Sequence, residues 1–148
     1  MNILVIEDNS LKREKIIEYL RSYSHIVVSE AASYNSGLTL AHECSFDFLI
    51  VDMSMPTFDR NEQTQGGRFR ALGGKEIVNK LAKIQKLPPF VILTGYKDFS
   101  VGTQSLSIEQ INDLLGSLGN SYLGCILFES SDNSWQEELG RVMGKLGC

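Results

Sequence analysis

Five apolar runs of strand length, separated by segments of helical periodicity, constrain the fold of this chain more than any other feature. Several of these runs are apolar throughout, which is typical of strands buried on both faces of a sheet. The runs are residues 3–6, 25–30, 46–52, 90–95 and 125–130. Strict alternation of such strands with helices predicts an α/β fold, in which right-handed crossovers place helices on both faces of a parallel sheet.

The segments between and after these runs carry apolar residues at helical spacing, which predicts five amphipathic helices. The stripes are Ile16, Ile17 and Leu20; Tyr34, Leu38 and Ala41; Ile77, Val78, Leu81 and Ile84; Ile108, Ile111, Leu115 and Leu118; and Trp135, Leu139, Val142, Met143 and Leu146. With 148 residues, 43% of them hydrophobic, the chain can bury one sizeable core more comfortably than two. We therefore expect a single domain over residues 1–148.

Charge and composition restrict the partners that we expect. The chain has 14 basic and 18 acidic residues and a net charge of −4, without a dense basic cluster, so we expect no direct binding to nucleic acid. The N-terminus lacks the basic start of a signal peptide, and no apolar window approaches the length of a membrane span. Cys44, Cys125 and Cys148 form no CxxC pair, as is usual for reduced thiols. These features predict a cytoplasmic protein that does not contact membranes.

Polar side chains occur where several of the predicted strands end. Glu7 and Asp8 follow the first strand, Asp52 ends the third and Thr94 lies at the end of the fourth. The carboxyl ends of parallel strands meet at one edge of a sheet, where ligands of such folds bind. Each acid taken alone could cap a helix or begin a turn. Three carboxylates brought together repel one another unless a cation lies among them, and an all-oxygen set suits Mg²⁺.

The motifs around these residues resemble the receiver domain of two-component response regulators. The resemblance covers most of the chain, and its most specific parts are ILVIEDN with Glu7 and Asp8, LIVDMSMP with Asp52, and VILTG with Thr94. It implies a flavodoxin-like fold, a doubly wound five-stranded parallel sheet of strand order 2-1-3-4-5 with helices on both faces.

The same resemblance implies a role for each site residue. Asp52 would be the phosphoacceptor, with a histidine kinase or another phosphodonor as the source of the phosphoryl group. Asp8, Asp52 and the backbone carbonyl of Ser54 would hold Mg²⁺, and Glu7 would act through a water. Thr94 would bind the phosphoryl oxygens. The resemblance implies no enzymatic activity; the output would be binding of a downstream protein through the face made by the fourth helix, fifth strand and fifth helix.

The lysine that ends the fifth strand in this family has no counterpart at that place in the sequence. Depending on the alignment, Glu129 or Cys125 takes its position, and between residues 98 and 144 the only basic residue is Arg141. Two forms of the receiver interpretation stay open: an atypical phosphoacceptor at Asp52, and a degenerate receiver that binds proteins independently of phosphorylation. A small Mg²⁺-dependent phosphohydrolase or nuclease is a more remote alternative.

A long segment follows the third predicted strand, where the family usually has a short connection. Residues 57–73 separate Pro56 from the glycine that opens the third helix. Long connections of this kind lie at the functional edge of such sheets or form solvated loops. Arg60, Arg68 and Arg70 in this extended loop could replace the missing cation; the alternative is that the loop is simply solvated.

Overall fold

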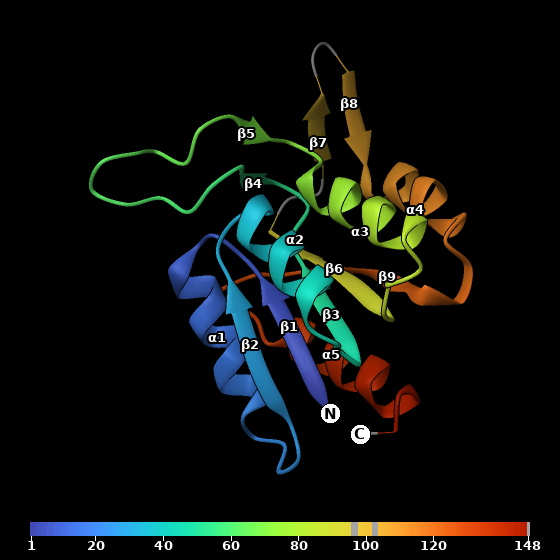
Figure 1. Cartoon of the computed structure of the whole chain (residues 1–148). Coiled ribbons are helices and arrows are strands. Elements are labelled where there is room, and N and C mark those ends of the chain that lie inside the picture. The colour runs from blue at the N-terminus through green and yellow to red at the C-terminus, as the bar shows by residue number, and fades with distance from the viewer. Residues whose placement is uncertain (96–97, 102–103, 148) are drawn as a thin grey trace.

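The apolar runs form a five-stranded parallel sheet in the computed structural model, which describes residues 1–95, 98–101 and 104–147 (Figure 1). Its strands are β1 (Asn2–Ile6), β2 (Val27–Ala31), β3 (Phe48–Val51), β6 (Phe90–Thr94) and β9 (Tyr122–Leu127). The strands lie in the order β2-β1-β3-β6-β9, and every neighbouring pair is parallel. Numbered within the sheet, this is the order 2-1-3-4-5, so the predicted flavodoxin-like topology is confirmed.

Helices cover both faces of the sheet, as its continuous apolar strands require. They are α1 (Ser10–Leu20), α2 (Tyr34–Glu43), α3 (Gly73–Lys83), α4 (Ile108–Gly116) and α5 (Ser134–Lys145), and a short 3₁₀ helix, η1 (Gly119–Ser121), precedes β9. Successive side chains of a strand point to opposite faces. Ile3 and Val5 accordingly pack in one core with residues of α1 and α5, whereas Leu4 and Ile6 pack in a second core with residues of α2, α3 and α4.

The last sheet strand lies earlier in the chain than predicted. We expected residues 125–130, but β9 is Tyr122–Leu127, so Glu129 lies beyond the strand. Gly124 has a φ of 129°, and the pairing of β9 with β6 changes register between Phe90 and Ile92. An irregular strand that contains glycine interrupts the apolar pattern from which strand limits are predicted.

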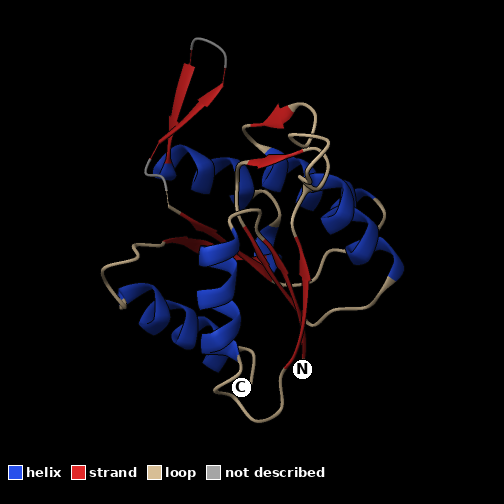
Figure 2. Cartoon of the chain, turned by 90° about the vertical axis from the view of Figure 1, so that its left-hand side faces the viewer, coloured by secondary structure: helices blue, strands red, loops and turns tan. Residues whose placement is uncertain are grey.

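Two antiparallel excursions extend from the end of the sheet where the parallel strands terminate (Figures 1 and 2). The first, within the predicted long loop, pairs β4 (Met55–Pro56) with β5 (Phe69–Arg70). The second, which was not predicted, pairs β7 (Asp98–Val101) with β8 (Gln104–Ser107) after β6. Residues 96–97 and 102–103 of that segment, and Cys148, lie outside the described residues. No helix in the described part of the chain has the length and hydropathy needed to cross a membrane.

Candidate functional site

Three carboxylates meet at the carboxyl ends of the central strands. Glu7 and Asp8 follow β1, and Asp52 follows β3, which pairs with β1 in parallel. Each of the three can place one oxygen within 4.8 Å of the others. We call Glu7, Asp8 and Asp52 the acidic cluster. Thr94, the last residue of the neighbouring strand β6, is fully buried.

Backbone contacts fix the position of Asp52. Its amide donates to the carbonyl of Ile6 at 3.1 Å, which continues the pairing of β1 with β3 by one residue. Its Oδ1 accepts a hydrogen bond from the amide of Met53 at 2.7 Å. Gly74, in the first turn of α3, packs so closely that a Cβ atom there would lie 2.3 Å from the carbonyl oxygen of Asp52. The start of α3 therefore holds the backbone that carries the central carboxylate.

Lys12 places a buried cation inside the acidic cluster, which the sequence analysis did not predict. Its Nζ lies 2.6 Å from Glu7 Oε2 and 3.3 Å from Asp52 Oδ2. It also donates a hydrogen bond to the carbonyl oxygen of Leu93 in β6 at 2.8 Å. Lys12 is only 8% exposed. Removing one partner of a buried ion pair typically costs about 3–5 kcal/mol of stability, so this lysine is an integral part of the site.

The start of α1 directs Lys12 toward the sheet. Asn9 caps the helix, and its side chain accepts a hydrogen bond from the amide of Lys12 at 3.0 Å. Lys12 precedes Ile16 and Leu20 at intervals of four residues, and all three are buried. Side chains at such intervals share one face of a helix. A lysine in line with the apolar stripe was thus the signal in the sequence that could have identified this cation.

The arginines of the long loop have other contacts. Arg60 lies 3.3 Å from Asp8 Oδ2, but its side chain is 51% exposed, and exposed ion pairs contribute little. Arg70 pairs with Glu76 at 2.8 Å. Arg68 is exposed. Among the three arginines suggested as replacements for the family's lysine, only Arg60 has a described contact with the acidic cluster.

Unlike Glu129, and together with Ser130, Phe128 after β9 faces the site. Its amide donates to the carbonyl of Thr94 at 2.8 Å, and its side chain is 9% exposed. The Nζ of Lys12 lies 5.7 Å from the centre of its ring. Glu129 is exposed. The residue beside the cation is therefore aromatic, whereas the two alignments placed Glu129 or Cys125 at the position of the family's lysine.

Burial changes the protonation of the acidic cluster. It raises the pKa of Glu7 to about 8; the charge of Asp52 adds to this effect, and Lys12 opposes it. Burial also raises the pKa of Asp8, and the charge of Arg60 opposes that shift. Desolvation disfavours an ionised carboxyl group unless a cation lies beside it. The cluster therefore has a strong electrostatic tendency to attract further positive charge.

The cluster opens to solvent through a pocket of roughly 650 Å³, whose wall includes Ser54, Phe69 and Phe128. The donors that Glu7, Asp8 and Asp52 offer are carboxylate oxygens, the ligand type of hard divalent cations. The residues present therefore fit a cation such as Mg²⁺.

Comparison with known proteins identifies the family. A sequence model of the response regulator receiver domain matches residues 3–115, which include the acidic cluster, Lys12 and Thr94. The chain belongs to this family. It is thus a receiver domain of the kind used in two-component signalling.

Relatives of this receiver domain match it over nearly its whole length. It is 25% identical to the Detocs response regulatory protein DtcB of Enterobacter cloacae, over 99% of this chain and 100% of that protein. The structure of the response regulator TrrA of Thermotoga maritima, solved in complex with Mg²⁺-BeF, superposes with a TM-score of 0.63 at 18% identity and covers 95% of this chain and 97% of TrrA. The structure of chemotaxis response regulator CheY4 of Vibrio cholerae superposes with a TM-score of 0.64 at 17% identity and covers 98% of this chain and 97% of CheY4. The two structures show that the fold is shared.

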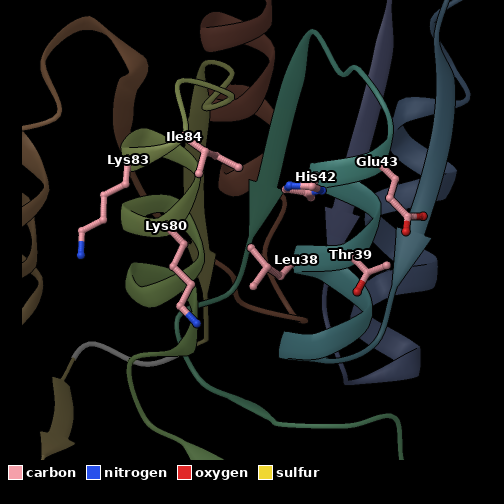
Figure 3. Close-up of a pocket in the computed structure, with 7 residues that line it drawn as sticks. All are labelled: Leu38, Thr39, His42, Glu43, Lys80, Lys83 and Ile84. Carbon is pink, nitrogen blue, oxygen red and sulfur yellow. The ribbon is translucent and has the colours of Figure 1, made fainter.

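A second pocket of this receiver domain lies between α2 and α3 (Figure 3). Its volume is roughly 410 Å³, and in the close-up Leu38 and Ile84 point toward the facing helix. His42, Glu43 and Lys80 contribute polar groups to the lining. This groove is separate from the acidic cluster, and its largely apolar centre does not offer the carboxylate set found there.

Proposed function

We propose that this receiver domain is a phosphoacceptor in a phosphorelay, with Asp52 as the acceptor and protein binding as the output. The acidic cluster carries this proposal, because Asp52 lies beside two further carboxylates at the floor of an open pocket. In the proposed site, Asp8, Asp52 and the backbone carbonyl of Ser54 hold Mg²⁺, and Glu7 acts through a water. The hydroxyl of Thr94 binds a phosphoryl oxygen.

The proposed reaction is a displacement at phosphorus. One carboxylate oxygen of Asp52 forms a bond to phosphorus while the bond from phosphorus to the donor breaks, and the donor group leaves with the bonding electrons. Mg²⁺, when bound, supplies positive charge beside the transferring oxygens. The chain contributes alignment: the amide of Met53 holds one oxygen of Asp52 at 2.7 Å, so the carboxylate has a fixed orientation.

The surroundings of the pocket favour a protein as the phosphodonor. Leu11 is 71% exposed and Phe69 is 56% exposed, and both line the pocket. Exposed apolar side chains grouped at a site are typical of protein interfaces. We propose that a histidine-containing kinase domain docks there.

Leu11→Asp should then slow phosphoryl transfer from the kinase by about tenfold, the effect of losing roughly 1.4 kcal/mol of docking energy, while binding of the small mimic beryllofluoride persists. Equal transfer rates would contradict docking at Leu11.

Trp135 offers a direct test of the phosphoacceptor proposal. It is the only tryptophan of the chain, is 2% exposed and lies 5.2 Å, ring centre to ring centre, from Phe128 at the pocket. Its fluorescence should change when beryllofluoride, a mimic of the phosphoryl group, is titrated in the presence of Mg²⁺. Asp52→Asn, which removes the acceptor oxygen's charge, should abolish the response. The wild-type protein should also incorporate phosphate from a small acyl phosphate, detected as a mass increase.

The alternatives predict different results. Phe128 directly after β9, with no lysine in that strand, is the observation that favours a degenerate receiver. Such a module would bind Mg²⁺ without responding to beryllofluoride. A phosphohydrolase or nuclease would turn over a phosphoester substrate. Either result would overturn the proposal that Asp52 is a stable phosphoacceptor.

A further inference from the structure

The ammonium group of Lys12 joins the ends of three strands at the point where a phosphoryl group would arrive. Its contacts are Glu7 after β1, Asp52 after β3 and the carbonyl of Leu93 in β6, at 2.6, 3.3 and 2.8 Å. An ammonium group has three N–H donors. Three acceptor oxygens lie within 3.3 Å of this nitrogen, and the ammonium group donates a hydrogen bond to the carbonyl of Leu93, so the chain surrounds the cation with acceptors.

We propose that Lys12, carried by α1, is the cation that binds the phosphoryl group on Asp52, in place of a lysine after β9. This inference rests on the proposed phosphoacceptor function. Because Lys12 already lies 3.3 Å from an oxygen of Asp52, it needs only a small shift to donate to an oxygen of a phosphoryl group attached there. Such charge-assisted hydrogen bonds are stronger than neutral ones.

Other basic side chains near the pocket are less well placed. Arg60 contacts Asp8 from the solvent side and is half exposed. Lys15, one turn along α1 from Lys12, is exposed, and its Nζ lies 3.5 Å from the carbonyl of Ser130. Within the described ranges, Lys12 is the basic residue with an ion pair to Asp52. A buried cation acts more strongly than an exposed one because solvent screens it less.

Lys12 should have opposite effects on the two ligands of the site. Its positive charge repels a divalent cation bound by Glu7, Asp8 and Asp52 but attracts the negatively charged phosphoryl group. Replacing it with a neutral side chain should therefore strengthen the binding of Mg²⁺ and weaken the binding of beryllofluoride. A residue that only maintained the shape of the pocket would weaken both when replaced. Opposite changes in the Mg²⁺ and beryllofluoride affinities would thus indicate a phosphoryl-binding cation, whereas changes in the same direction would indicate a residue that only maintains the pocket.

The experiment measures both affinities by Trp135 fluorescence in wild type, Lys12→Gln and Lys15→Gln. For Lys12→Gln, the Kd for beryllofluoride at saturating Mg²⁺ should rise by about tenfold or more, as expected for one lost charge-assisted hydrogen bond. Its Kd for Mg²⁺ alone should fall by roughly threefold or more. Lys15→Gln makes the same change in net charge on the same helix, and its effects should remain below about threefold because solvent screens this charge.

A second variant tests whether a lysine directly after β9 can replace Lys12. Phe128 is packed next to the Nζ of Lys12, so Lys12→Gln combined with Phe128→Lys should recover much of the lost beryllofluoride affinity. If Lys12→Gln does not fold, the combination of Lys12→Met with Phe128→Lys is measured instead. Unchanged beryllofluoride binding in Lys12→Gln, parallel weakening of both ligands, or no recovery in the double variant would overturn the role of Lys12. If the wild-type protein itself did not bind beryllofluoride, the proposed function would fail instead.

Discussion

The thiol of Cys125 shows how strongly the interior of this receiver domain affects a single residue. Cys125 lies in β9 and is partly buried. Burial raises the pKa of its thiol to about 12, and the charge of Asp52 acts in the same direction. The thiolate is the reactive form of cysteine. Cys44, by contrast, is exposed at the end of α2.

We predict that iodoacetamide modifies Cys44 well before Cys125 in the folded protein. Because the pKa of Cys125 is raised, its thiolate fraction stays small until the pH approaches 12. Raising the pH to about 9 should therefore increase the absolute rate of Cys125 alkylation only slightly. Peptide mass spectrometry after timed labelling measures both rates. In urea the two cysteines should react alike. Similar rates in the folded protein would contradict the protection of Cys125.

The contact between α3 and the segment after β3 determines the position of Asp52 at the scale of whole elements. The first turn of α3 includes Gly74, whose amide donates to the carbonyl of Met53 at 2.8 Å. A Cβ at position 74 would lie 2.3 Å from the carbonyl oxygen of Asp52 and 3.1 Å from Cα of Met53. Both atoms belong to the backbone, so they cannot move aside as a flexible side chain would. The helix can approach this closely only because residue 74 is glycine.

We predict that Gly74→Ala lowers the free energy of unfolding by about 1–3 kcal/mol, the usual cost of overpacking, and weakens Mg²⁺ binding by displacing Asp52. Gly116→Ala in α4 is the matched control, because a Cβ there would meet no atom within 4 Å apart from its chain neighbours and the backbone of its own helix. It should be neutral or slightly stabilising, since alanine favours helix more than glycine does. Urea unfolding and Mg²⁺ titration measure the two quantities. Equal stability of the two variants would show that the backbone after β3 relaxes without cost.

The elements differ in how far the sequence predicted them. The parallel strands and five helices were predictable because continuous apolar runs and helical stripes each extend over several residues. The start of β9 was not, because Gly124 and the change in register interrupt its pattern. The cation was missed for a different reason: Lys12 contacts residues that follow β1 and β3 and a carbonyl in β6, and only the folded chain brings those three strands to one point. The acids were predictable because Glu7 and Asp52 directly follow strands and Asp8 is adjacent to Glu7.

At the scale of the whole molecule, the two cores support the sheet while the excursions lie above its functional edge (Figure 2). The first excursion is closed by hydrogen bonds from the amide of Thr57 to the carbonyl of Arg68 and from the amide of Phe58 to the carbonyl of Gly66, at 3.0 and 2.9 Å. Residues 59–65 lie beyond this closure and, apart from partly exposed contacts such as that of Arg60 with Asp8, add little to either core.

We predict that the fold tolerates replacement of residues 59–65 by Asn-Gly, a dipeptide suited to a two-residue hairpin turn. Loss of a solvated segment changes stability only slightly, so the melting temperature should shift by no more than a few degrees. Because the replacement removes Arg60, Mg²⁺ binding should become slightly stronger, while beryllofluoride binding should persist with Lys12 in place. Calorimetry and Trp135 fluorescence measure these effects. Loss of beryllofluoride binding would indicate that the loop, rather than α1, supplies the cation.

The aromatic ring after β9 also has a consequence for how this site can change by mutation. Every base of a phenylalanine codon differs from the corresponding base of a lysine codon, so no single-base substitution converts Phe128 into a lysine. A variant that lost Lys12 would thus have no one-step route back through position 128. Genetic selection for suppressors of Lys12→Gln should therefore recover reversion at codon 12 rather than repair at codon 128, unless the library is built with whole-codon replacement.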